Sequence, residues 1–229
     1  MLIKWGSIVV EGSGKLGGHV FYKGKGDAVI RTLARARNPQ TRSQQTVKSR
    51  FTKLTQDWSN LTDDQRQSWN EATSSFSRKN RFGDVVLLTG KNLYNSLNQQ
   101  LLITGQPLLD FAPVPRRQAS NILNFITYDV SDAFLQLRGV FTDNAKYVVV
   151  ATPKVSSGTT NVKALLRIIG VSAGSNDGDR VDDPVGLGNA YRDMFGNLAV
   201  GDTAYGGCYT VNSSGQKSTL ALVRMNVRA

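Results

Sequence analysis

The pattern nearest to a chemical motif lies close to the N-terminus, where Gly12-Ser13-Gly14-Lys15-Leu16-Gly17 fits the form G-x-G-x-x-G. In dinucleotide-binding proteins this pattern follows a strand and opens a helix, whose N-terminus holds the pyrophosphate. Here a strand-like segment, Gly18 to Tyr22, comes next, and no suitable acid follows for a ribose. We therefore expect a glycine-rich turn or contact loop, and no cofactor.

Residues for nucleophilic or acid–base catalysis are scarce. The chain has one cysteine, Cys208, and one histidine, His19. One cysteine forms neither an internal disulfide nor a thiolate metal cluster, and one imidazole leaves few proton-transfer options near neutral pH. These shortages predict a protein that is not an enzyme, with no catalytic, cofactor-binding or metal-binding residues.

An acidic segment, Asn176-Asp177-Gly178-Asp179 with Asp182-Asp183 after it, offers carboxylates to calcium. It does not have the EF-hand register, in which ligands alternate before a glycine and a distant glutamate closes the site. The sequence therefore favours a solvated loop here.

The charge of the chain is concentrated near the N-terminus. The formal charge is +11, and residues 12–53 hold ten basic residues against one acid, Asp27. Such an excess predicts an anionic partner, either an acidic protein or a nucleic acid, although a solvated face without a specific role stays open. Phe21 and Tyr22 lie among these bases, at strand positions where packing in a core is the commoner role. The predicted contact residues are Lys15, Lys23, Lys25, Arg31, Arg35, Arg37, Arg42, Lys48, Arg50 and Lys53.

The elements that would position these bases begin with short strands. Residues 2–10, 18–22 and 28–32 are strand-like, with turns at 11–17 and 23–27. Three such strands expose too much edge to be stable alone. They therefore need a partner surface.

Three helices are expected next. The first begins at Asn38-Pro39, and its apolar residues recur at helical spacing. A capping box, Thr62 to Gln65, opens a second helix that packs on the first as a hairpin, with Trp58 and Trp69 near the joint. A third runs from about Gly90 to Thr104 and ends at Gly105. The apolar stripes comprise Val47, Phe51, Leu54, Trp58 and Leu61 in the first helix, Trp69, Ala72 and Phe76 in the second, and Leu93, Leu97 and Leu101 in the third.

The remaining sequence predicts a second, β-rich domain. Three prolines within nine residues indicate an extended connector over 106–119. Alternating segments follow, which predict an antiparallel sandwich of immunoglobulin or fibronectin III type. The fold class is therefore α+β with two domains, 1–105 and 120–229. The β-like segments are 121–128, 133–141, 145–151, 162–171, 203–211 and 218–227.

The longest apolar runs are far shorter than a membrane span, so we expect no membrane partner. The first residues lack the basic region and long apolar stretch of a secretory signal. These features predict a protein that folds in a cytoplasm.

Short motifs along nearly the whole chain resemble a group of virion-associated proteins of tailed phages and prophages, many from Bacteroidetes hosts, including components of crAss-like phages. The motifs are Gly17-Gly18-x-Val20-Phe21-Tyr22-Lys23, Val29-Ile30-Arg31, Asn38-Pro39-Gln40-Thr41, Gln45, Arg50-Phe51, Trp58-x-x-Leu61-Thr62-x-x-Gln65-Arg66-x-x-Trp69, Gly90-x-Asn92-Leu93-Tyr94-Asn95-x-Leu97-Asn98, Gly105-Gln106-Pro107, Tyr191-x-x-x-Phe195-Gly196-x-Leu198 and Ser214-Gly215-Gln216-x-Ser218.

The resemblance implies a non-enzymatic virion protein assembled in the bacterial host cytoplasm. Its expected form is a homo-oligomeric ring at the head–tail junction or a capsid-associated subunit, docking through its basic N-terminal region. The implied partners are portal, tail or capsid proteins, together with packaged DNA. The alternatives are a nucleic-acid-binding protein that uses the same bases and, less favoured, a hydrolase or carbohydrate-binding protein of the phage surface.

Overall fold

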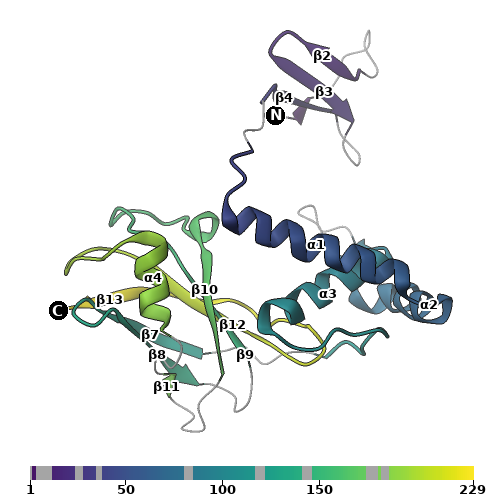
Figure 1. The fold of residues 1–229 in the computed structure, drawn as a ribbon. Coiled ribbons are helices and arrows are strands. Elements are labelled where there is room, and N and C mark those ends of the chain that lie inside the picture. The colour runs from purple at the N-terminus through teal and green to yellow at the C-terminus, as the bar shows by residue number, and fades with distance from the viewer. Residues whose placement is uncertain are drawn as a thin grey trace. The chain divides into compact units, whose positions relative to one another are not determined.

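The computed structural model has an α+β fold, and its contacts divide the chain into two compact units, residues 1–45 and 46–229 (Figure 1). The first unit holds a small sheet, and the second holds helices and a larger sheet. The predicted division into domains of 1–105 and 120–229, with a linker at 106–119, stays a prediction. The structure describes residues 2–3, 12–23, 28–34, 38–79, 85–116, 122–140, 146–173, 180–181 and 186–229.

The N-terminal unit is an antiparallel sheet in the order β1-β4-β3-β2. The strands predicted at 18–22 and 28–32 are confirmed, whereas the turn predicted at 11–17 is wrong in part. Residues 14–16 form a strand because Gly17 adopts a left-handed φ of 55°, so that a two-residue turn suffices and Leu16 pairs with His19. Residues 4–10 of the predicted first strand lie outside the described residues. The strands are β1 (Leu2–Ile3), β2 (Gly14–Leu16), β3 (His19–Lys23) and β4 (Ala28–Thr32).

The first helix, α1 (Arg42–Asn60), begins later than the predicted Asn38-Pro39. Gln40 has a φ of 48°, which a right-handed helix cannot include. Thr41 and Gln44 form two reciprocal hydrogen bonds. The Gln44 N–H donates to Thr41 Oγ1 at 3.4 Å, and the Thr41 N–H donates to Gln44 Oε1 at 3.3 Å. The helix therefore starts at a capping box that the sequence reading passed over.

The other helix boundaries confirm the sequence predictions. Thr62 and Gln65 form the reciprocal capping box of α2 (Asp63–Ala72), which continues as the 3₁₀ helix η1 (Thr73–Phe76). Helix α3 (Gly90–Thr104) ends at Gly105, whose φ is 67°. Two short strands, β5 (Arg78–Lys79) and β6 (Val85–Val86), pair between η1 and α3.

The helical core forms around Tyr94 of α3. Its ring centroid lies 5.4 Å from that of Trp58 and 5.3 Å from that of Trp69, so the two tryptophans meet through Tyr94. The apolar stripe of α1 is buried only in its second half, because Val47 and Phe51 are 51% and 53% exposed. The buried residues of this core are Leu54, Leu61, Trp69, Leu93, Tyr94 and Leu97.

Residues 106–116, expected as part of an extended connector, lie along the helices. The buried side chain of Asn98 accepts a hydrogen bond from Leu109 N–H at 2.8 Å and donates one to Leu109 O at 3.3 Å. Trp69 Nε1 donates to Asp110 O at 2.8 Å. We call residues 106–116 the strap. The side chains of Asn98 and Trp69 form hydrogen bonds with its main-chain groups at Leu109 and Asp110.

The larger sheet has the strand order β10-β9-β12-β13-β7-β8-β11. The predicted β segments are confirmed in position except 162–171, whose first residues form a 3₁₀ turn, and the short strand at 180–181 was not predicted. The predicted antiparallel sandwich is not confirmed, because β13 pairs with β7 in parallel and joins the strands in one mixed sheet. Alternating apolar residues predict which side chains face a core, and leave strand order and direction undetermined. The strands are β7 (Ile122–Asp129), β8 (Phe134–Val140), β9 (Lys146–Ala151), β10 (Arg167–Ala173), β11 (Arg180–Val181), β12 (Tyr205–Val211) and β13 (Ala221–Arg228).

A helix that the sequence reading missed, α4 (Leu187–Phe195), packs on this sheet (Figure 1). Tyr191 is fully buried, and its hydroxyl donates to Thr152 O at 3.0 Å. Its ring lies 5.3 Å from that of Tyr128. Gly188 lets the helix approach the Ala133 carbonyl, where a Cβ would clash. A 3₁₀ turn, η2 (Lys163–Leu165), precedes β10.

The Asn98→Ala substitution tests the attachment of the strap. It leaves the Leu109 N–H and carbonyl without partners, and we expect a loss of about 1–3 kcal/mol in the free energy of unfolding. Hydrogen exchange of the Leu109 amide should become faster. The matched control is Asn92→Ala at an exposed position of α3, and equal effects of the two variants would contradict this role.

Candidate interaction surface

Cys208 and His19 lie in different units of the chain. Cys208 is fully buried in the larger sheet, and burial raises the pKa of its thiol to about 12. His19 is exposed on β3. Within the described ranges, no group of three or more His, Cys, Asp or Glu residues is placed to hold a metal ion. The described helices also include none that is long and apolar enough to span a membrane.

One face of the N-terminal sheet combines two cations with an aromatic ring. The register aligns Lys15, Val20 and Arg31 in one row across β2, β3 and β4. Tyr22 follows two residues after Val20 and so lies on the same face. The Arg31 guanidinium lies 5.7 Å from the centre of the Tyr22 ring, and that side chain is 43% exposed. We call Lys15, Val20, Tyr22, Val29 and Arg31 the basic face.

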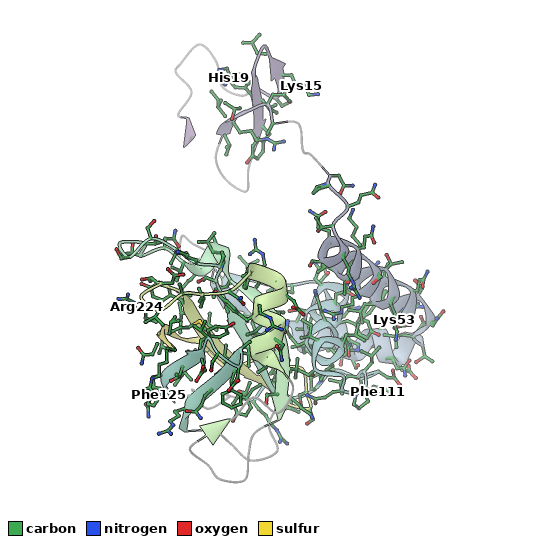
Figure 2. All side chains as sticks on the ribbon, turned by 60° about the vertical axis from the view of Figure 1, so that its left-hand side comes forward. Lys15, His19, Lys53, Phe111, Phe125 and Arg224 are labelled. Atoms are coloured by element: carbon green, nitrogen blue, oxygen red, sulfur yellow. The ribbon has the colours of Figure 1, made fainter. Side chains whose placement is uncertain are left out.

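The opposite face of the same sheet is apolar at its centre. Phe21 pairs with Ile30, and Leu16 pairs with His19 beside them. The Leu16 side chain is 71% exposed. Figure 2 labels Lys15 and His19, which lie on opposite faces. We call Leu16, Phe21 and Ile30 the apolar face.

The N-terminal sheet has no buried core among its described residues. Every described side chain from residue 12 to residue 34 is exposed or half-buried. A small sheet is stable only when an apolar face packs against another layer. The described apolar side chains of this sheet are therefore at least partly exposed to solvent.

Phe21 and Tyr22 show what the sequence reading missed. Both were expected at core positions, but neighbouring residues of a strand point to opposite faces. The structure leaves Tyr22 exposed next to Arg31 and places Phe21 on the apolar face. The alternation of side chains within 18–22 and 28–32 separates Tyr22 from Phe21. Only the pairing register between the two strands shows that Arg31 lies on the face of Tyr22.

The other predicted contact residues are distributed along the chain. Arg42, Arg50 and Lys53 recur at intervals of eight and three residues, which places them on one flank of α1, with Lys48 on the other. The side chain of Lys23 is not among those described, and Lys25, Arg35 and Arg37 lie outside the described residues. Of the ten bases, the structure thus brings Lys15 and Arg31 together on one sheet face and three more on one flank of α1.

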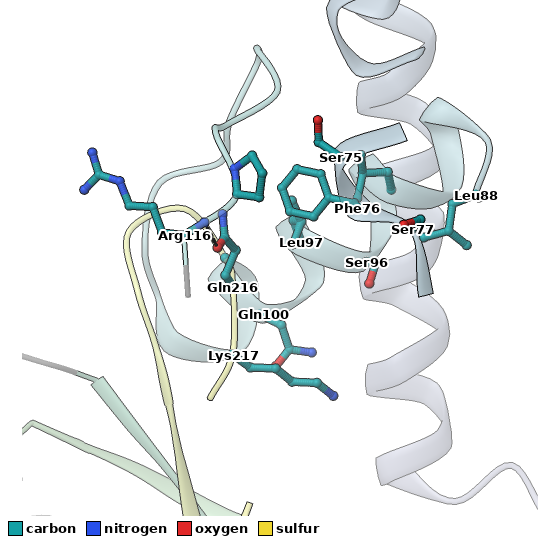
Figure 3. Close-up of a pocket in the computed structure, with 13 residues that line it drawn as sticks. Ser75, Phe76, Ser77, Leu88, Ser96, Leu97, Gln100, Arg116, Gln216 and Lys217 are labelled. Carbon is teal, nitrogen blue, oxygen red and sulfur yellow. Dashed lines mark hydrogen bonds between the residues drawn. The ribbon is translucent and has the colours of Figure 1, made fainter. Parts of the chain in front are cut away.

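A second candidate is a pocket of about 590 Å³ in the unit formed by residues 46–229 (Figure 3). It lies between η1, α3 and residues 215–217, with Phe76 and Leu97 facing each other. Three serines, Arg116 and Lys217 also line it, and its described lining residues include no Asp, Glu, His or Cys.

A comparison with protein-family models and with curated proteins finds no match to this chain. The strongest chemical features are the two dissimilar faces of one exposed sheet.

Stability should fall at alkaline pH because several buried groups keep their protons in the folded state. Burial, followed by the nearby Asp57 and Asp110 carboxylates, raises the pKa of Tyr94 to about 12, and burial raises that of Cys208 to about 12. In the unfolded chain these groups titrate near roughly 10 and 8.5. The contribution of these protonated groups to the free energy of unfolding is therefore complete below about pH 8.5 and is lost as the pH rises toward 12.

Guanidinium unfolding at a series of pH values checks this expectation. The midpoint should decrease from pH 8 to pH 11, and absorbance at 295 nm should show part of the tyrosine titrating only on unfolding. A midpoint that stays constant or rises over this range would contradict it.

Proposed function

We propose that this chain is a non-enzymatic structural protein that enters a multi-subunit assembly through its N-terminal sheet. The observation that carries the proposal is a sheet of short strands in which no described side chain between residues 12 and 34 is buried. Its apolar face gains free energy on contact with a partner, at roughly 25 cal/mol per Å² of apolar surface removed from water. The body of residues 46–229, in contrast, has two buried clusters of its own.

A closed homo-oligomer is the form of assembly that best fits this surface. In a closed symmetric oligomer the same small interface is repeated at every subunit contact. The short N-terminal sheet then provides one such interface per subunit. Strand β2 lies at the edge of the order β1-β4-β3-β2. An edge strand can add to a sheet of a neighbouring subunit through its main-chain groups.

The setting we propose is a tailed-phage virion. The supporting observation is the resemblance of the motifs from Gly17 to Ser218 to virion-associated proteins. In that setting the chain forms a ring at the head–tail junction or a capsid-associated layer, and basic side chains along α1, such as Arg50 and Lys53, dock on acidic surfaces of portal, tail or capsid proteins. The protein is then located in the phage particle, after it has folded in the host cytoplasm.

Charging the apolar face should dissociate the oligomer. Leu16→Asp and Ile30→Asp each place a carboxylate at an apolar contact, and we expect the mass in mass photometry to fall to that of a monomer. Val200→Asp changes an apolar residue that is 63% exposed in the other unit and serves as the matched control. A wild-type chain that is monomeric at all concentrations, or Leu16 and Ile30 variants of unchanged mass, would refute the proposed interface.

The copy number in purified phage particles tests the setting. Quantitative peptide mass spectrometry against the major capsid protein should give about a dozen copies for a ring at the portal vertex, because that site imposes cyclic repetition. Hundreds of copies would indicate a capsid-associated layer. Absence from the particle would contradict the virion role.

A further inference from the structure

We propose that the basic face of the N-terminal sheet binds single-stranded nucleic acid, with the Tyr22 ring stacking on a base and with Lys15 and Arg31 contacting phosphates. This role is additional to assembly through the apolar face, and it uses different side chains. The two roles can therefore be tested separately.

The charge of this surface favours an anion. The described residues of the unit, 2–3, 12–23, 28–34 and 38–45, include no Asp or Glu. Lys15 and Arg31 lie in one row with β3 between their strands, so their backbones are separated by two strand spacings, roughly 10 Å. Both side chains are exposed. They form two separate positive points on one flat face, which suits successive phosphates of a chain.

The aromatic ring distinguishes a nucleic acid from an acidic protein. Tyr22 is 43% exposed, and the Arg31 guanidinium lies 5.7 Å from its ring centre. Exposed tyrosine rings and arginine planes beside a basic groove provide stacking surfaces for unpaired bases. An acidic protein surface would use the two cations but would gain little from the ring. A duplex keeps its bases stacked internally, so the ring favours a single strand.

The glycines near Lys15 leave room for the nucleic-acid backbone to approach the protein main chain. At Gly14, Gly17 and Gly18, an added Cβ would have no described atom within 4 Å beyond the adjacent residues. Glycines without side chains permit close approach of a ligand to main-chain groups. The G-x-G-x-x-G pattern thus retains a role in contact, although it opens no helix.

Fluorescence anisotropy of the full chain with a labelled oligothymidylate, at several salt concentrations, tests the proposal. Lys15→Ala and Arg31→Ala should each weaken binding and reduce the slope of log K against log salt by about 0.7. Tyr22→Ala should weaken binding about tenfold, whereas Tyr22→Phe should retain it because the ring stays. Lys163→Ala, at an exposed lysine of the other unit, removes the same charge and should leave binding nearly unchanged.

Three results would overturn this assignment. They are no binding at low salt, an equal loss in Lys163→Ala, and no effect of Tyr22→Ala. Polyglutamate that competes as well as the oligonucleotide at equal ionic strength would indicate an acidic protein partner instead. Mass photometry of the Lys15 and Arg31 variants should still report the wild-type oligomer, so failure of this proposal and failure of the assembly interface are distinguishable.

Discussion

The body of the molecule depends on side-chain amides that bind a stretch of backbone without regular structure. Asn98 bonds to both main-chain groups of Leu109, and the Gln216 amide accepts from Arg116 N–H at 2.7 Å and donates to Val114 O at 2.9 Å. The main-chain groups of the half-buried Leu109 would cost more without partners than these bonds contribute. The strap is therefore fixed to α3 at one end and to the β12–β13 connection at the other.

Helix α3 transmits this constraint to the larger sheet. Its Gln100 Oε1 accepts from the Tyr209 hydroxyl at 3.2 Å, and Gly215, with a φ of 70°, lies so close to the Leu97 carbonyl that a Cβ would clash. The pocket beside Leu97 forms where these segments meet. Helices, strap and sheet thus make one body, residues 46–229.

The N-terminal sheet differs from that body in how many of its side chains are buried. The body buries aromatic rings such as Trp69, Tyr94 and Tyr191, whereas no described side chain from 12 to 34 is buried. An apolar residue such as Leu16, which is 71% exposed in this sheet, gains stability when a partner covers it. Our proposals for assembly and for nucleic-acid contact both follow from this difference between the two units.

The sequence by itself determined the local elements, because capping, glycine conformation and side-chain period act within a few residues. The Thr62–Gln65 capping box, the end of α3 at Gly105 and most strand positions of the larger sheet were predictable. The parallel pairing of β13 with β7, helix α4 and the Tyr22–Arg31 contact were decided only by the tertiary structure. Each depends on which distant segments become neighbours, and a period of two or of 3.6 residues selects a face without selecting its partner.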